Sequence, residues 1–213
     1  MTLPNYKLFC SGKNNRTAIA VPNDLCAWAV TELSDEDTTV IMLENTDKET
    51  ILITSSYLDI TLDSVISDTL QKVLDFSRVK NIPILIGCDS NSHSTLWGCD
   101  SNNARGDIVE EWILHNELSI INSGNVKTFV STRGSSIIDL TLASPCLLTQ
   151  IKGWYVEEKY QFSDHRKIVF HLDFCTSKEL WSQDLKKADW TKFRMILKTL
   201  PKLNAPLTWK MFN

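Results

Sequence analysis

Glycine and proline are scarce in this chain, with 7 and 6 residues among 213. Collagen-like and low-complexity sequences are rich in these residues, so both classes are excluded. Long apolar runs are missing too, because no stretch approaches the roughly 18 consecutive apolar residues that a membrane span needs. The amino-terminal segment lacks the apolar core of a secretory signal. With 43% apolar and 23% charged residues, the composition predicts a globular intracellular protein without a membrane partner.

The six cysteines form no C-x-x-C pair and show no spacing typical of a zinc finger. A chain of this length can build a sufficient core without disulfides, and nothing in the sequence indicates secretion. We therefore expect free thiols, most of them buried as small apolar side chains.

Charge is distributed unevenly, although the formal net charge is only −4. Residues 1–177 carry 14 basic and 23 acidic side chains, whereas residues 178–213 carry 8 and 3. This break predicts an acidic domain over residues 1–177 and a basic helical linker over residues 178–213. An acidic domain that acts on an anionic substrate needs a cation as intermediary, which favours a divalent metal.

Short apolar and β-branched runs, separated by turn-forming clusters, predict many short strands. Apolar spacing predicts one helix that begins after a cap at Asp63 or Ser64 and a second that begins near residue 106. The continuous apolar run 83–86 is typical of a strand buried on both faces. The expected fold class is α/β (α+β), with two packed, mainly antiparallel β-sheets flanked by helices in a four-layer sandwich.

The run 83–86 leads into a segment able to do chemistry, because Asp89 and Asn91 follow it closely. Side chains two residues apart on an extended chain face the same way. A carboxylate beside a carboxamide suits a hard metal ion and a phosphate oxygen together. A strand followed by an Asx-turn has the same residue types, so this segment alone leaves both interpretations open.

Three more candidates lie at or near predicted strands. Asp164 and His165 precede the alternating run 167–174, and each would need its own partner, such as a metal for Asp164 and a phosphate or carboxylate for His165. Asp139 interrupts an apolar run and, if buried, needs a partner such as a histidine from a neighbouring strand. Tyr57 ends another run and could donate to a phosphate oxygen. Solvated loops, a solvent-facing Asp139 and an ordinary rim tyrosine are the alternatives.

The order of these residues along the chain resembles the endonuclease/exonuclease/phosphatase superfamily. The segment 88–98, CDSNSHSTLWG, is similar to the D-x-N-A-H-x-x-W-G segment in the apurinic-type endonuclease domain of jockey-like non-LTR retrotransposons. Further matches continue in register at residues 103–107, 110–113, 128–129 and 138–141, and residues 187–193 are similar to the start of the linker toward their reverse transcriptase. The resemblance covers about residues 5–195.

The resemblance implies a divalent-metal-dependent DNA endonuclease that hydrolyses a phosphodiester. It would nick one strand and leave a 3′-hydroxyl primer for integration by target-primed reverse transcription. His165 would contact the scissile phosphate or act as general acid/base, with Asp139 orienting it. Asp89 would position or deprotonate the attacking water, and Asn91 and Tyr57 would hold phosphate oxygens.

The implied cofactor is Mg²⁺, with Mn²⁺ as an alternative, and Asp164 would help to bind it. The implied partners are double-stranded DNA and a reverse transcriptase domain of the same element, met in the nucleus at the time of action. Candidate DNA contacts lie on two loops that could equally be ordinary surface loops: Arg105, Lys127, Phe129 and Arg133.

One departure from the family concerns the amino terminus. Family members begin with a β-α-β unit that carries a metal-binding Glu, whereas this sequence begins with MTLPNY, after that position. Its early glutamates at positions 32, 44 and 49 stand in a different context. We therefore expect an N-terminally truncated domain, and the alternative function is a catalytically impaired fragment or remnant that only binds DNA or a partner. A phosphoinositide or nucleotide substrate is a third reading, which the segment 88–98 disfavours.

Overall fold

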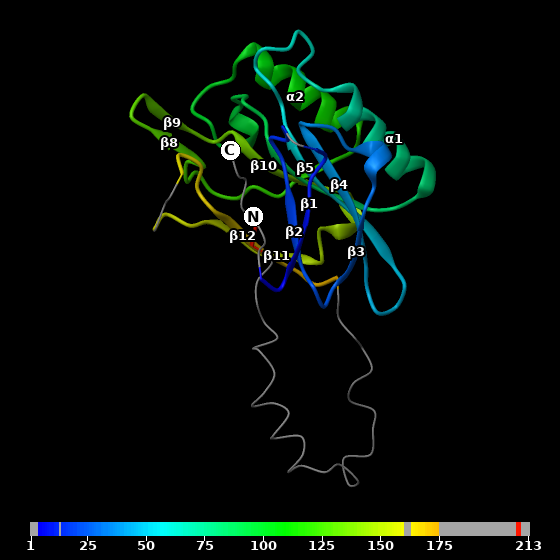
Figure 1. The fold of residues 1–213 in the computed structure, drawn as a ribbon. Coiled ribbons are helices and arrows are strands. Elements are labelled where there is room, and N and C mark those ends of the chain that lie inside the picture. Colours follow the sequence, from blue (N-terminus) through cyan, green and yellow to red (C-terminus); the bar gives the residue numbers. More distant parts are fainter. Residues whose placement is uncertain (1–3, 13, 160–162, 175–207, 210–213) are drawn as a thin grey trace, which may run out of the picture.

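The computed structural model describes residues 4–12, 14–159, 163–174 and 208–209 (Figure 1). Its largest element is a six-stranded sheet in which β5 and β6 are parallel and every other neighbouring pair is antiparallel. In spatial order its strands are β3 (Cys26–Ala29), β4 (Thr38–Glu44), β5 (Thr50–Tyr57), β6 (Ile84–Asp89), β10 (Asp139–Ala143) and β7 (Ser119–Ile120). These strand directions confirm the expected α/β class with mainly antiparallel sheets.

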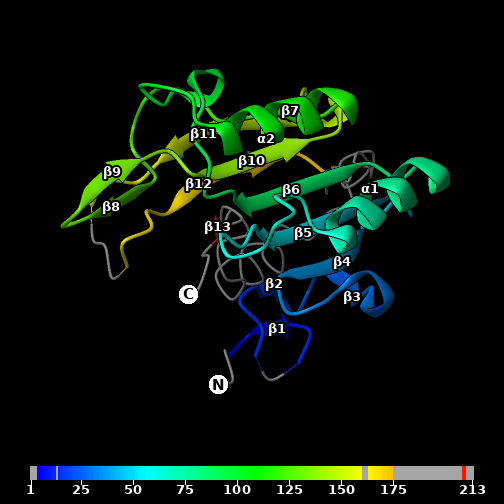
Figure 2. The same cartoon turned by 90° about the horizontal axis from the view of Figure 1, so that it is seen from above.

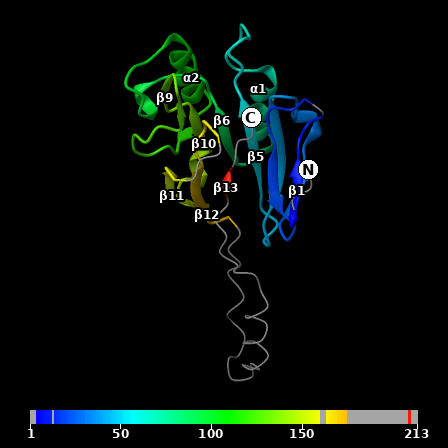
Figure 3. The same cartoon turned by 60° about the vertical axis from the view of Figure 1, so that its left-hand side comes forward.

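A second layer of strands packs against one face of this sheet. Figures 2 and 3 show one hairpin of this layer near the β4 side and the other near the β10 side. The strands are β1 (Tyr6–Phe9) with β2 (Ile19–Pro22), and β11 (Ile151–Val156) with β12 (Ile168–Leu172) and β13 (Thr208–Trp209). A separate hairpin consists of β8 (Phe129–Ser131) and β9 (Gly134–Ser136). The two packed sheets are therefore confirmed.

Two helices cover the opposite face of the six-stranded sheet. Helix α1 (Asp68–Lys80) makes the crossover between the parallel strands β5 and β6, as such a connection requires. Helix α2 (Ala104–His115) follows the long loop after β6. Short 3-10 turns complete the described elements: η1 (Thr31–Leu33), η2 (Thr95–Trp97) and η3 (Pro145–Leu147). The helix expected in the tail lies outside the described residues.

Both helices begin where a side chain can cap them, and both sequence-based starts were wrong. Ser67, rather than Asp63 or Ser64, caps α1 because its hydroxyl accepts a hydrogen bond from the Leu70 amide. The apolar residues before it instead belong to the loop after β5. Helix α2 begins at Ala104, two residues before the start expected near residue 106, because the Asn103 side chain accepts a hydrogen bond from the Gly106 amide at 2.7 Å.

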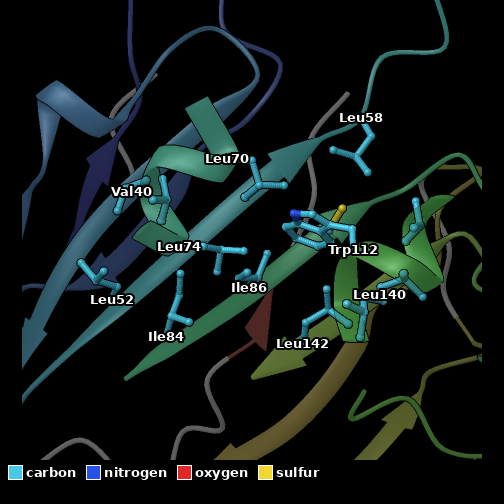
Figure 4. Close-up of a cluster of buried hydrophobic side chains, with 14 of the residues drawn as sticks. Val40, Leu52, Leu58, Leu70, Leu74, Ile84, Ile86, Trp112, Leu140 and Leu142 are labelled. Atoms are coloured by element: carbon cyan, nitrogen blue, oxygen red, sulfur yellow. The ribbon is translucent and has the colours of Figure 1, made fainter. Parts of the chain in front are cut away.

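Alternating side chains divide the apolar core into two clusters, one on each face of the six-stranded sheet. Within β4, for example, Val40 faces the helices while Ile41 faces the second strand layer. Figure 4 shows the helix-side cluster, in which α1 and α2 contribute Leu70, Leu74 and Trp112 and the strands contribute Val40, Leu52, Ile84, Ile86, Leu140 and Leu142. Each fully buried side chain of this size contributes about 1.5–3 kcal/mol of transfer free energy. The site described below is built on this packed support.

Cysteine and membrane expectations can be checked on the same described residues. The five cysteines within them are free thiols, as expected, but Cys10, Cys26 and Cys146 are exposed and only Cys88 is buried. The expectation that most are buried was therefore wrong, because three of them lie on an edge strand or in turns rather than on an inward face. Among the described helices, none is long and apolar enough to cross a membrane.

Candidate active site

Three of the candidate site residues stand in one row across adjacent strands. Strand pairing sets Tyr57 at the end of β5 opposite Asp89 at the end of β6, and Asp89 opposite Asp139 at the start of β10. Because β10 runs antiparallel, its first residue meets the last residues of the other two strands at the same edge of the sheet. The sequence prediction for these three residues therefore converges on a single place.

His165 joins this row from the loop before β12. Its Nδ1 lies 2.9 Å and 3.1 Å from the two carboxylate oxygens of Asp139. When Nδ1–H donates to this carboxylate, the tautomer of His165 is fixed. The other ring nitrogen, Nε2, then faces Asp89, whose Oδ2 is 3.7 Å away. The expected Asp–His pair is thus present, and a second carboxylate faces the other side of the ring.

The loop that carries His165 is held by β8. His165 forms an antiparallel bridge with Phe129, and the two rings meet edge to face with centroids 5.0 Å apart. Backbone hydrogen bonds on either side, from Val130 to the Asp164 carbonyl and from Arg166 to the Thr128 carbonyl, extend this pairing. The imidazole is therefore placed by backbone pairing as well as by Asp139.

Asp139 is fully buried and is fixed by two side chains that the sequence reasoning did not assign a role. The Thr128 hydroxyl accepts hydrogen bonds from the Ile138 and Asp139 amides at 3.1 Å each. Asn122 lies just after the short strand β7, and its side-chain amide donates to the Asp139 backbone carbonyl at 2.9 Å. Thr128 belongs to the family match at residues 128–129, which was the available signal, whereas nothing local marks Asn122.

Asp89 and His165 influence each other electrostatically. Burial, then the nearby charge of Asp139, raises the pKa of Asp89 to about 7, while the charge of His165 opposes this rise. Burial disfavours the charged form of His165, but its hydrogen bond and charge interaction with Asp139 outweigh burial and raise the pKa of the imidazole. The site therefore holds a carboxylate that can exchange a proton near neutral pH beside an imidazole that favours its protonated form.

Asn91 and Tyr57 extend the site on the β5 side. Asn91 has a left-handed backbone with φ of 48°, its amide donates to Asp89 Oδ1 at 3.3 Å, and its side chain donates to the Leu58 carbonyl at 3.2 Å. Burial, then the charges of Asp59 and Asp89, raises the pKa of Tyr57, so the phenol stays protonated and can donate.

The charge balance of the row suits a divalent cation. Ligand atoms of Asp89, Asp139 and His165 lie within 4.8 Å of one another. The Asp139 oxygens already accept from His165, so Asp89 is the member with a carboxylate oxygen to offer. Asp89 and Asp139 are two buried carboxylates that stand close together. Their repulsion, after burial, raises the pKa of Asp89, and a hard cation with oxygen ligands would relieve it. Asp164 is exposed beside His165, outside this cluster of ligand atoms.

The four candidate DNA contacts have different surroundings. Arg105 donates to the carbonyls of Leu58, Asp59 and Ser90, so its guanidinium ties together the loops after β5 and β6. The ammonium of Lys127 lies 3.2 Å from an oxygen of Asp100, and Phe129 contacts His165 as described. Arg133 is exposed in the turn between β8 and β9. Contact with DNA stays a prediction for all four residues.

Two packed sheets that bring a carboxylate-flanked imidazole, an amide and a phenol to one edge define a hydrolase of the nuclease and phosphodiesterase type. The chain belongs to the endonuclease-reverse transcriptase family, whose sequence profile matches residues 51–169. This assignment confirms the resemblance to the endonuclease/exonuclease/phosphatase proteins of non-LTR retrotransposons.

Individual proteins support the assignment. The chain is 34% identical over 102 residues to the retrovirus-related Pol polyprotein from type-1 retrotransposable element R1 of Bradysia coprophila. This match covers 43% of the chain and about a tenth (10%) of that polyprotein. Among solved structures, the endonuclease domain of TRAS1, a telomere-specific non-LTR retrotransposon, has 28% identity and a TM-score of 0.71, with 80% of this chain and 81% of that chain covered. The AP endonuclease LMAP from Leishmania major shares the fold, with 13% identity, a TM-score of 0.62, and coverage of 80% and 72%.

Proposed function

We propose that this domain hydrolyses phosphodiester bonds in double-stranded DNA with the help of a divalent cation. It would nick one strand and leave a 3′-hydroxyl for target-primed reverse transcription. The observation that carries the proposal is the row of Tyr57, Asp89 and Asp139 with His165 seated between the two carboxylates. The family assignment supports the nuclease chemistry, and the R1 and TRAS1 relatives support a retrotransposon setting.

The chain's own residues divide the work of hydrolysis. Asp89 takes a proton from the attacking water as the new bond to phosphorus forms, for which its pKa of about 7 suits it. The bond between phosphorus and O3′ breaks, and O3′ takes up a proton from solvent and leaves as a hydroxyl. His165 donates from Nε2 to a phosphate oxygen, and its charge stabilises the negative charge that develops there. Asn91 and Tyr57 hold further phosphate oxygens as donors.

We propose Mg²⁺ as the cation, with Mn²⁺ as an alternative, held by Asp89 and with Asp164 as an additional ligand. When bound, it neutralises charge on the phosphoryl group and lowers the pKa of a bound water. A reverse transcriptase domain of the same element is the proposed partner, and action on chromosomal DNA would place the protein in the nucleus.

The test is nicking of supercoiled plasmid with Mg²⁺, with Mn²⁺ and with EDTA. His165→Ala should abolish nicking, whereas His171→Ala, an exposed histidine on β12, is the matched control and should leave it unchanged. Extension of the nicked product by a DNA polymerase would verify the 3′-hydroxyl. A folded wild-type chain that never nicks, or nicking that persists in His165→Ala, would contradict the proposal, and the first result would favour a remnant that only binds DNA.

A further inference from the structure

Arg16 reaches the rim of the site from the segment that leads into β2. Its backbone amide donates to the Glu36 carbonyl at 2.7 Å, which docks this segment beside the start of β4. Its guanidinium contacts the carboxylates of Asp37 and Asp59 and lies over the ring of Tyr57, 4.7 Å from the centroid. One arginine therefore joins three elements that are far apart in the sequence.

Asp37 and Asp59 hold the chain at Tyr57 and just beyond it, Asp37 through its backbone carbonyl and Asp59 through its carboxylate. The Asp37 carbonyl accepts from the Tyr57 amide at 2.8 Å. Beyond Tyr57, Asp59 Oδ1 accepts from the amide and hydroxyl of Thr61 at 2.7 Å and 2.8 Å, while Oδ2 pairs with Arg16. These contacts fix the conformation of the loop after β5. The Tyr57 ring, which makes none of them, is covered by the Arg16 guanidinium.

The same contacts argue against Arg16 as a direct phosphate ligand. Its charge already faces two carboxylates, and although burial opposes the charged form, the hydrogen bonds with Asp59 and Asp37 raise its pKa overall. The hydrogen bond from the Thr61 amide, then those from Arg16 and from the Thr61 hydroxyl, lower the pKa of Asp59 to about 2, so this carboxylate is ionised at neutral pH. An arginine neutralised in this way has little charge left to attract DNA.

We propose that Arg16 is a positioning residue that fixes the Tyr57 ring so that its hydroxyl meets a phosphate oxygen. The proposal rests on the proposed nuclease function. A cation over the face of an aromatic ring restrains its rotation, and the hydrogen bond from the Tyr57 amide to the Asp37 carbonyl holds the backbone that carries the ring. With both restraints present, the phenol is oriented before substrate arrives, which lowers the barrier that depends on correct placement.

The expected effect is on turnover more than on substrate affinity. Arg16→Met should lower kcat for nicking about tenfold with little change in KM, because a cation–π contact and its orienting effect are lost. Arg16→Lys keeps the charge but loses the planar stacking and paired donors, so it should fall between wild type and Arg16→Met. Arg78→Met removes an arginine that pairs with Asp75 on α1, away from Tyr57, and should change kcat by less than about twofold.

A double-mutant cycle with Tyr57→Phe separates positioning from a general structural role. If Arg16 acts through the phenol, Arg16→Met should cost less than about twofold in the Tyr57→Phe background, because the hydroxyl it positions is already gone. If the loss of kcat in the double variant equals the product of the losses in the two single variants, the proposal is overturned and the nuclease function is unaffected. Urea unfolding of each variant verifies that rates are compared between folded proteins.

A readout that needs no activity keeps the inference separate from the proposed function. A fluorotyrosine at position 57, followed by fluorine NMR, reports the environment and mobility of the ring. Arg16→Met should move this resonance toward that of a free tyrosine, and Arg78→Met should leave it in place. If the wild-type chain fails to nick, the proposed function is contradicted. A resonance that moves in Arg16→Met still supports positioning of the Tyr57 ring, and a resonance that stays in place overturns it.

Discussion

Replacing Asp89 by asparagine should make the metal-free protein more stable above neutral pH. The carboxylate is 4% exposed, and it is flanked by fully buried Asp139 and by His165. Burial and the charge of Asp139 raise the pKa of Asp89 from its ordinary value of 3.8 to about 7. Asparagine has the same shape, and its amide oxygen can still accept from the Asn91 amide, so Asp89→Asn removes the charge with little change in packing.

The magnitude follows from linkage. Between pH 3.8 and about 7 the folded protein holds the Asp89 proton and the unfolded chain has released it, so wild-type stability falls as pH rises through this window. Above pH 7 the group is ionised in both states and the full penalty applies. At about 1.4 kcal/mol per pH unit, the shift sets an upper bound of about 4 kcal/mol, a value that already includes the favourable charge of His165.

The assay is urea unfolding followed by tryptophan fluorescence in EDTA from pH 5 to pH 8. The advantage of Asp89→Asn should grow between pH 5 and pH 7 and then level off. Asp75→Asn, at an exposed position on α1, is the control and should stay within about 0.5 kcal/mol of wild type at every pH. A variant that is less stable throughout, or an advantage that does not change with pH, would refute the reasoning.

Titration with Mg²⁺ tests whether the Asp89 carboxylate binds the cation. A cation that binds only the folded state stabilises it by mass action. Wild type should therefore gain stability on titration with Mg²⁺ and Asp89→Asn should gain much less, so the difference between them narrows. Equal gains in both proteins would show that Asp89 is not a ligand.

Further predictions concern the imidazole, the pH profile and one glycine. Asp139→Asn should lower nicking about a hundredfold or more and move the high-pH fall in activity to lower pH, because Asp139 orients His165 and raises its pKa. Wild-type nicking should rise with pH as Asp89 ionises, at a pH below 7 because bound Mg²⁺ favours the carboxylate, and fall again as His165 loses its proton, which a pH–rate profile would record. Gly106→Ala should lower the free energy of unfolding by about 2 kcal/mol or more, measured in urea, because an added Cβ would lie 1.9 Å from the His93 carbonyl oxygen.

The residues that meet at this place could be named from the sequence because each stands at or within a recognisable apolar run, although each run alone left a structural interpretation open. The run before Asp89 marks a buried strand, and Asp139 stands out as a charge within an apolar run. The helix starts were harder, since Asp63, Ser64 and Ser67 are all residue types able to cap and only the folded loop decides among them. A local pattern names the candidates but does not choose between equivalent ones.

The geometry of the site could not be read from local patterns. Asp89 meets Asp139 because β10 pairs antiparallel with β6, a register set by contacts some 50 residues apart along the chain. His165 reaches Asp139 through a bridge to Phe129, a residue that the sequence marked only as a surface candidate. Arg16 went unnoticed because a lone arginine has no signature, and its partners Asp37 and Asp59 lie in two other loops.

The same register that brings the site together also explains why its charges conflict. Neighbouring strands place Asp89 and Asp139 directly opposite each other, and the packed core beneath them prevents either from turning toward solvent. His165 relieves Asp139 through a direct hydrogen bond but stays 3.7 Å from Asp89, which keeps that carboxylate only partly compensated. An uncompensated buried carboxylate destabilises the fold, yet the same condition holds its pKa near neutrality and leaves an oxygen for water or a cation. Stability and reactivity at Asp89 therefore have one physical cause, and a substitution that restores the first should remove the second.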